Sequence, residues 1–250
     1  MLNSFFMALS MFSRLPVPEI DFKKANMKYA LCFFPAVGLI IGFFQCLAYC
    51  FLIRLEFSKI LISSVITVIP ILITGGIHLD GFIDTSDARK SYAGTKKKLD
   101  IMSDPHTGAF GVICTLVYFV LYFGFIYEAG PECIYLFAKC FIISRCLSGI
   151  AAVSFKCAKK EGLLFTFSSS SDSDFTRGIL TAVYFICSVW IVTKNGFAGV
   201  MCVLASGAVF VYYRYFSYKE FGGITGDLAG YFLQICELIM LMCAVVFCRA

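Results

Sequence analysis

Three aspartates stand close together in the first third of the chain, directly after a long apolar run. Asp80, Asp84 and Asp87 are spaced at i, i+4 and i+7, which places their carboxylates on one face of a helix. Like charges at such short range repel one another, so the cluster is costly unless a cation lies among them. Carboxylate oxygens without thiolates favour Mg²⁺ or Mn²⁺ over zinc, and Mg²⁺ held this way usually completes its coordination with water and substrate phosphates. The spacing therefore indicates metal-dependent phosphate chemistry.

Two further polar groups flank this cluster. His78 precedes the first aspartate, and Asp104 follows in a segment that also holds His106. We interpret His78 as a candidate proton acceptor and Asp104 as a candidate metal ligand. A plainer interpretation stays open for the acids, because the helix dipole favours carboxylates in a first turn and Asp104 could cap the helix that follows Pro105.

A glycine-rich segment, residues 222–227, precedes the last apolar run. Closely spaced glycines let backbone N–H groups approach phosphate oxygens, and Thr225 with Asp227 could hold a metal ion or a ribose hydroxyl. A simple glycine-rich turn before a membrane helix is the alternative, and the segment alone does not decide between the two.

Charged residues also occur inside two apolar runs. Glu237 lies near the middle of the last run, where a carboxylate at mid-membrane costs on the order of 3 kcal/mol. Arg145 and Lys139 lie in an earlier run and are its candidate partners. Lys139 could instead extend to the interface, whereas Arg145 lies too centrally for that. We predict that Glu237 and Arg145 form a pair or share a substrate group.

The chain that must position these residues is mostly apolar. Of its 250 residues 60% are hydrophobic and only 15% are charged, with a formal net charge of +5, against roughly 25% charged in a soluble domain. The mean hydropathy is +0.85. One soluble domain cannot bury that much apolar surface, and a chain with 28 Phe and 13 Tyr cannot stay solvated as a coil. A soluble enzyme and a disordered chain are therefore excluded, and the main solvent is lipid.

Seven apolar runs are candidate membrane spans, since crossing about 30 Å of hydrocarbon takes ~20 helical residues. No internal repeat or linker divides them. We therefore predict an all-α, polytopic membrane helix bundle that forms one domain over residues 1–250, with Met1–Phe12 as an interfacial helix. The predicted spans are Leu31–Ile53, Ile60–Ile77, Ala109–Tyr127, Ile134–Phe155, Ile179–Thr193, Gly196–Tyr213 and Leu228–Cys248.

The distribution of basic residues predicts the orientation of these spans. Fifteen of the 21 lysines and arginines fall in the N-terminal segment and in the loops 78–108, 156–178 and 214–227, and four fall on the other side. Lys and Arg collect in cytoplasmic loops, so the N-terminus and these three loops are predicted to be cytoplasmic and the C-terminus to lie outside.

The thirteen cysteines are not arranged as a disulfide framework or a zinc site. Nearly all lie within apolar runs, and no two form a C-x-x-C pair. We expect them to pack as small hydrophobic side chains.

Several motifs follow one another in an order typical of one family. They are Ser13–Pro18, Phe34–Leu39, Gly75–Gly81 continuing through Asp84 and Asp87, Ile101–Asp104 with Gly108, Ser144–Arg145, Lys160–Leu163, and Gly222–Asp227 with Glu237–Leu238. In these motifs the chain resembles the adenosylcobinamide-GDP ribazoletransferases, or cobalamin synthases, over nearly its whole length. The pattern His-x-Asp-Gly-x-x-Asp-x-x-Asp is the most specific of them.

The resemblance implies a Mg²⁺-dependent membrane enzyme of late cobalamin (vitamin B12) synthesis. Such an enzyme transfers the cobinamide phosphate of adenosylcobinamide-GDP to α-ribazole or its 5′-phosphate and releases GMP. The implied metal ligands are Asp80, Asp84, Asp87 and Asp104. The implied catalytic residues are His78, Asp80, Asp84, Asp87 and Arg145. The implied substrate-binding residues are Lys160, Glu161, Thr225, Gly226, Asp227 and Glu237.

The resemblance also implies a multi-pass protein of the cell membrane with its active site on the cytoplasmic side. Its partners are the two substrates and the lipid bilayer, with no nucleic acid, and the oligomeric state stays open. The chain departs from the family pattern at His106, at Lys159, where Arg is usual, and at Gln234, where an acid is usual. Lys lacks the bidentate phosphate fork of Arg, so a phosphate contact at position 159 is less strongly implied.

Two other classes remain as alternatives. A CDP-alcohol phosphotransferase is also a small helical membrane enzyme that uses aspartates and Mg²⁺, but its first Asp would stand where this chain has Ile77. An ion-coupled transporter would accommodate acids near helix ends, yet the acids here cluster on one side and no inverted repeat is present.

Overall fold

The computed structural model describes residues 1–18, 21 and 24–248, and its regular elements are helices. Within this part of the chain the only extended pairing is an isolated bridge between Cys157 and Ile224. The predicted all-α class is confirmed. The elements are α1 (Leu2–Phe12), α2 (Lys24–Met27), η1 (Ala30–Phe33), α3 (Phe34–Arg54), α4 (Lys59–Thr74), α5 (Ile77–Lys90), α6 (Thr95–Ile101), α7 (Ala109–Glu128), α8 (Pro131–Ser154), α9 (Leu163–Ser170), α10 (Ser173–Phe216), η2 (Ser217–Phe221) and α11 (Gly226–Cys248).

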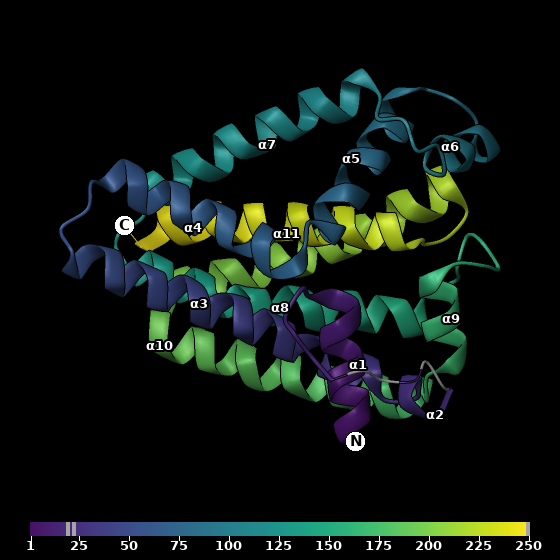
Figure 1. Ribbon diagram of the computed structural model, residues 1–250, viewed down its shortest axis with the longest axis horizontal. Helices are drawn as coiled ribbons and strands as arrows, with labels where there is room; N and C mark the ends of the chain where they lie inside the picture. Colours follow the sequence, from purple (N-terminus) through teal and green to yellow (C-terminus); the bar gives the residue numbers. More distant parts are fainter. Residues whose placement is uncertain (19–20, 22–23, 249–250) are drawn as a thin grey trace.

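The long helices lie side by side, roughly along the longest axis of the molecule (Figure 1). Helix α1 runs across this bundle at a steep angle, and α5, α6 and α9 gather at one end. The connection between α3 and α4 and the C-terminal end of α11 lie at the opposite end. The chain segments with candidate chemistry are therefore held at one end of a helix bundle.

Helix α8 is the central helix, and most of its residues between Cys133 and Val153 are buried. Helix α3 packs tightly against it through Gly38 and Gly42. A Cβ atom at either glycine would lie 2.3 Å from a backbone carbonyl oxygen of α8, that of Phe141 or of Ala138. Small residues at this spacing allow two membrane helices to approach closely, so this pair forms the rigid centre of the bundle.

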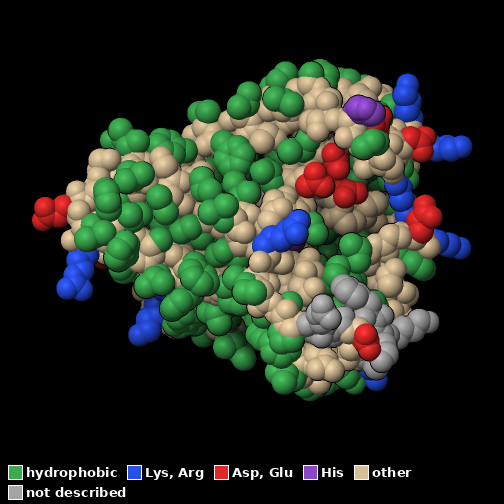
Figure 2. Space-filling model, viewed as in Figure 1, with side chains coloured by type: hydrophobic (Ala, Val, Ile, Leu, Met, Phe, Trp, Pro, Cys, Tyr) green, Lys and Arg blue, Asp and Glu red, His purple; other side chains and the backbone are tan. Residues whose placement is uncertain are grey.

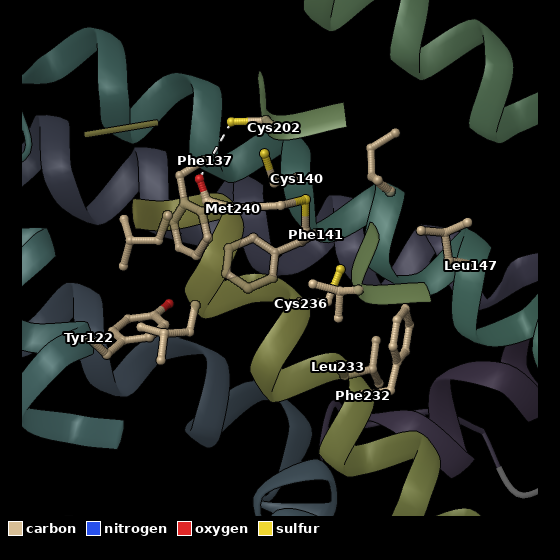
Figure 3. Close-up of a cluster of buried hydrophobic side chains, with 14 of the residues drawn as sticks. Tyr122, Phe137, Cys140, Phe141, Leu147, Cys202, Phe232, Leu233, Cys236 and Met240 are labelled. Atoms are coloured by element: carbon tan, nitrogen blue, oxygen red, sulfur yellow. Dashed lines mark hydrogen bonds between the residues drawn. The ribbon is translucent and has the colours of Figure 1, made fainter. Parts of the chain in front are cut away.

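The core around α8 is aromatic and sulfur-rich (Figure 3). Phe137 and Phe141 pack with ring centroids 4.8 Å apart, and the thiol of Cys202 lies 3.4 Å from the carbonyl oxygen of Met240. All thirteen cysteines, each within the described part of the chain, are free. Most of them pack among apolar side chains, as expected for small hydrophobic residues.

In the described residues, five helices are long and apolar enough to cross a membrane, or six if one bent pair counts as a single span. The bent pair is α4 with α5, which turn by 94° between Thr74 and Ile77. The protein is therefore a multi-pass membrane protein. The predicted span Ile60–Ile77 corresponds to α4, which ends at Thr74.

Helix α10 combines two of the predicted spans. Its 44 residues are interrupted at Gly196, whose backbone angles (φ 54°, ψ −131°) are not helical. A Cβ at Gly199 would lie 2.6 Å from the carbonyl oxygen of Ile191, whereas residues eight positions apart in a straight helix are separated by about 12 Å. The chain therefore reverses direction at Gly196, and α10 supplies two antiparallel crossings where the sequence predicts Ile179–Thr193 and Gly196–Tyr213.

With this reversal, the helices of the described residues make seven passes along the bundle if α4 and α5 count as one. The segments predicted to be cytoplasmic then share the end that carries α5, α6 and α9 (Figure 1). Lys23 and Arg249, which enter the count of basic residues, lie outside the described residues.

Candidate active site

The three aspartates of the cluster lie on one helix, α5, as the spacing predicts. Helix α4 ends at Thr74 and α5 begins at Ile77. The two residues between them, Gly75 and Gly76, adopt left-handed backbone angles, with φ of 65° and 78°. Residues with a Cβ rarely take this conformation, so the glycine pair makes the sharp turn possible. The turn directs α5 away from the axis of α4 and across the end of α11 (Figure 1).

Close backbone packing brings a fourth aspartate to the cluster. A Cβ at Gly81 of α5 would lie 2.7 Å from the Cα and carbonyl oxygen of Asp227, and one at Gly230 of α11 would lie 2.8 Å from the carbonyl oxygen of His78. The first turn of α11 is thus in direct contact with the first turn of α5. Asp84 consequently lies within electrostatic range of Asp80, Asp87 and Asp227.

Figure 2 shows acidic side chains gathered on one face of the molecule, with a basic group nearby. Among the described residues, no three His, Cys, Asp or Glu side chains converge closely enough to hold a metal ion by themselves. The carboxylates of α5 and α11 thus form a concentrated negative region without a complete set of protein ligands.

Asp87 has a defined structural role. Its two carboxylate oxygens accept hydrogen bonds of 2.8 Å from the backbone N–H groups of Gly108 and Gly111. These donors belong to the first turn of α7, where N–H groups lack partners within the helix. Asp87 therefore caps α7 and fixes this helix to α5.

Asp104 lies apart from the cluster. Its carboxylate is exposed and accepts hydrogen bonds from the backbone N–H of His106 at 2.9 Å and from the His106 ring at 2.8 Å. These bonds lower the pKa of Asp104. The carboxylate borders a shallow depression on α6, together with Lys96, Lys97 and Asp100.

A cavity of about 580 Å³ opens beside the cluster, between α1, α5, α8, α9 and the start of α11. Its size lies within the range of about 300–1,000 Å³ that is typical of small-molecule sites. The predicted site residues that line it are His78, Asp80, Glu161, Thr225, Gly226 and Asp227. The cavity therefore joins the two motifs that stand about 150 residues apart in the sequence.

The structure places Lys159 in this cavity, whereas the neighbouring Lys160 is exposed and does not line it. The ammonium group of Lys159 donates to the carbonyl oxygen of Leu99, at 3.2 Å, and to the hydroxyl of Ser103. Its loop is joined to the glycine-rich segment, because the N–H of Ile224 donates to the carbonyl of Lys156 at 2.8 Å. The sequence gives no means to tell which of two adjacent lysines faces the cavity.

Arg145 and Glu237 form a salt bridge between α8 and α11, as predicted. Both side chains are almost fully buried, and the hydroxyl of Ser144 donates to the same carboxylate at 3.0 Å. Lys139 instead approaches Asn195 and the ring of Trp190. The ion pair borders a small separate space and does not line the 580 Å³ cavity.

Arg14 lies against the turn between α4 and α5. Its backbone N–H donates to the carbonyl oxygen of Ile73 at 2.7 Å, and a Cβ at Gly75 would lie 2.3 Å from its side chain. The residue is exposed, and its guanidinium has no hydrogen bond or ion pair to another described residue. This places a cation close to the start of α5.

Comparison with known proteins identifies the family. The model of the cobalamin-5-phosphate synthase family matches residues 4–245. The chain belongs to this family. Among its curated relatives, the adenosylcobinamide-GDP ribazoletransferase of Lachnoclostridium phytofermentans is 40% identical over 238 residues, which cover 95% of this chain and 91% of the relative. The enzyme of the same name from Clostridium botulinum strain Alaska E43 is 31% identical over 246 residues, 96% of each chain.

No solved structure matches this member of the cobalamin-5-phosphate synthase family. Its family places it at the final step of cobalamin synthesis, as the sequence motifs indicate. The comparisons favour neither a CDP-alcohol phosphotransferase nor an ion-coupled transporter.

Proposed function

We propose that the protein transfers the cobinamide phosphate of adenosylcobinamide-GDP to a free ribose hydroxyl of α-ribazole or of its 5′-phosphate. The observation that carries this proposal is the meeting of Asp80 of α5 with Asp227, Thr225 and Lys159 at one cavity, with Asp84 within electrostatic range of both aspartates. Phosphoryl transfer needs neutralisation of phosphate charge and alignment of the nucleophile more than it needs covalent help from the protein. This site offers groups for both tasks.

The donor set suits Mg²⁺. Carboxylate oxygens are the ligands this ion prefers, and Mg²⁺ is commonly held by one or two carboxylates together with substrate phosphates and water. Asp80, Asp84 and Asp227 would each offer it a carboxylate oxygen, with substrate phosphate and water completing the set of ligands, since these aspartates repel one another without a cation. Bound Mg²⁺ would neutralise charge on the transferring phosphoryl group. Asp87 supports this arrangement by fixing α5 to α7.

The reaction makes one P–O bond and breaks another. A free ribose hydroxyl oxygen of the acceptor attacks the phosphorus that carries cobinamide, the bond to the bridging oxygen of the diphosphate breaks, and GMP leaves with that oxygen. His78 and Asp80 are the proposed acceptors of the hydroxyl proton, because both line the cavity; the Nε2 atom of His78 is itself buried and has no partner among the described residues. The proton moves from the attacking oxygen to one of these two side chains.

Two cations are placed to stabilise the departing GMP. Lys159 lies in the cavity wall within electrostatic range of Asp227, and Arg14 lies at the turn that starts α5. Glu161 and Gly226 complete the polar lining, where Gly226 leaves the first turn of α11 open to a phosphate oxygen. The Arg145–Glu237 pair acts at a distance, by holding α8 against α11.

We also propose that this site faces the cytoplasm at the cell membrane. The end of the bundle that carries the cavity also carries most of the basic loop residues, and such residues collect on the cytoplasmic side.

Product analysis tests the proposed function. Purified protein in detergent is given adenosylcobinamide-GDP, α-ribazole and Mg²⁺, and GMP is measured. We expect GMP release that requires α-ribazole and is matched by formation of the joined corrinoid. Absence of GMP would contradict the proposal, and release of CMP from a CDP-linked alcohol in a parallel assay would favour the phosphotransferase alternative.

A further inference from the structure

The 580 Å³ cavity has two chemically different ends. Three residues of its wall, Leu31, Ala152 and Phe167, belong to one buried apolar cluster, and Met11, Phe12 and Leu164 pack against that cluster. At the other end stand the carboxylates and Lys159. A ligand that fits the whole cavity therefore has one apolar part and one polar part.

A row of aromatic rings connects the two ends. The ring centroid of Phe12 lies 6.2 Å from that of Phe167 and 4.3 Å from that of Phe34. The ring of Phe34 lies 5.9 Å from that of His78, which is next to the aspartates. Offset and tilted ring contacts at 4.5–7 Å are favourable for a further aromatic ring. The wall thus suits a flat aromatic group with a polar tail toward His78.

The size of the cavity limits its occupant. A volume of about 580 Å³ lies within the range of roughly 300–1,000 Å³ in which proteins enclose a drug-sized ligand. A nucleoside with a two-ring base belongs to this size class. A corrinoid joined to a nucleotide is several times larger, so its bulk must lie outside the cavity.

We infer that the cavity is the subsite of the acceptor nucleoside, with its apolar aromatic base against Phe12, Leu164 and Phe167 and its reacting ribose hydroxyl toward His78 and Asp80. This inference rests on the proposed function and assigns one of its two substrates to a location. The larger donor then reaches the carboxylates from the outer face of α5, where the acidic side chains are exposed in Figure 2.

The chemistry of the two bases supports this assignment. The dimethylbenzimidazole of α-ribazole is an apolar two-ring group, whereas guanine carries donors and acceptors along its edges. The side chains of Leu31, Ala152 and Phe167, with those of Met11, Phe12 and Leu164, give this part of the wall an apolar surface. A guanine buried there would leave polar atoms unpaired, which costs about 1–3 kcal/mol for each group.

The test compares two substitutions on the same helix. Phe12→Leu removes a ring from the cavity wall, and Phe6→Leu makes the same change at a position of α1 that does not line the cavity. For each purified variant, KM is measured for both substrates from the rate of GMP release. We expect Phe12→Leu to raise KM for α-ribazole about five- to tenfold, as for loss of one aromatic contact, and to leave KM for adenosylcobinamide-GDP within about twofold. Phe6→Leu should change neither.

A second variant tests the apolar character of the subsite directly. Leu164→Asn adds an amide to the half-buried wall, and we expect it to raise the ratio of kcat/KM for a purine riboside to that for α-ribazole about fivefold or more. Three results would overturn the assignment. They are an increase in KM for adenosylcobinamide-GDP alone, an equal increase in KM for both substrates, and no change in either variant. A wild-type protein that releases no GMP would instead contradict the proposed function itself.

Discussion

The contact between α5 and α11 gives the sharpest test of how the site is built. A Cβ at Gly81 would lie 2.7 Å from the Cα of Asp227, whereas non-bonded carbon atoms pack at about 3.5–4.0 Å. Gly81→Ala must therefore separate the two helices by roughly 1 Å. Misplacement of this size can reduce a rate by about a hundredfold, or about 2.7 kcal/mol in transition-state stabilisation. We expect kcat/KM to fall by that factor while the protein still inserts into the membrane.

The matched control is Gly178→Ala. Gly178 also lies in a helix, but a Cβ there meets nothing within 4 Å, so this variant should keep wild-type activity. Both variants are purified, checked for a single species by size-exclusion chromatography, and assayed for GMP release. Activity of Gly81→Ala within threefold of wild type would refute the view that close backbone contact positions the aspartates.

The remaining predictions concern topology and the buried ion pair. A cysteine-reactive tag in the loop 129–132 should be accessible from outside intact cells, whereas a tag at 168–173 should not. Finding both tags on the same side of the membrane would contradict the predicted orientation. Arg145→Gln and Glu237→Gln should each lower the free energy of unfolding, by about 3–5 kcal/mol if the partner is left charged and buried. In the double variant the loss should be clearly smaller than the sum, and additivity within ~0.5 kcal/mol would mean that the two residues act independently.

The membrane bundle could be predicted from composition because lipid imposes a simple rule. Every span needs a long apolar run, and these runs are visible in the sequence. The end of the second span was predicted less accurately. Helix α4 ends at Thr74, because Gly75 and Gly76 adopt left-handed backbone angles directly after it. The reversal at Gly196 was predicted as a gap between two runs, and Gly196 is the residue whose backbone angles leave the helical region.

Site residues that share one helix could be predicted from their spacing in the sequence. Site residues that are brought together by packing between helices could not be predicted in this way. The spacing of Asp80 and Asp84 places them on one face of α5, whatever the rest of the fold does. The approach of Asp227 depends on small residues in two different helices, which no local pattern contains. Likewise, Lys159 rather than Lys160 lines the cavity because its loop is joined to the glycine-rich segment.

The central claim is that the carboxylates of α5 support metal-dependent phosphate transfer, and one comparison tests it most directly. GMP release is measured for wild type, Asp84→Asn and the control Asp100→Asn, each with Mg²⁺ and after treatment with a chelator. The account predicts that only wild type and Asp100→Asn are active, only with Mg²⁺, and that Asp84→Asn is at least about a hundredfold slower, because Asn keeps the shape but loses the charge. Wild-type activity in chelator, or near-normal activity of Asp84→Asn, would contradict it.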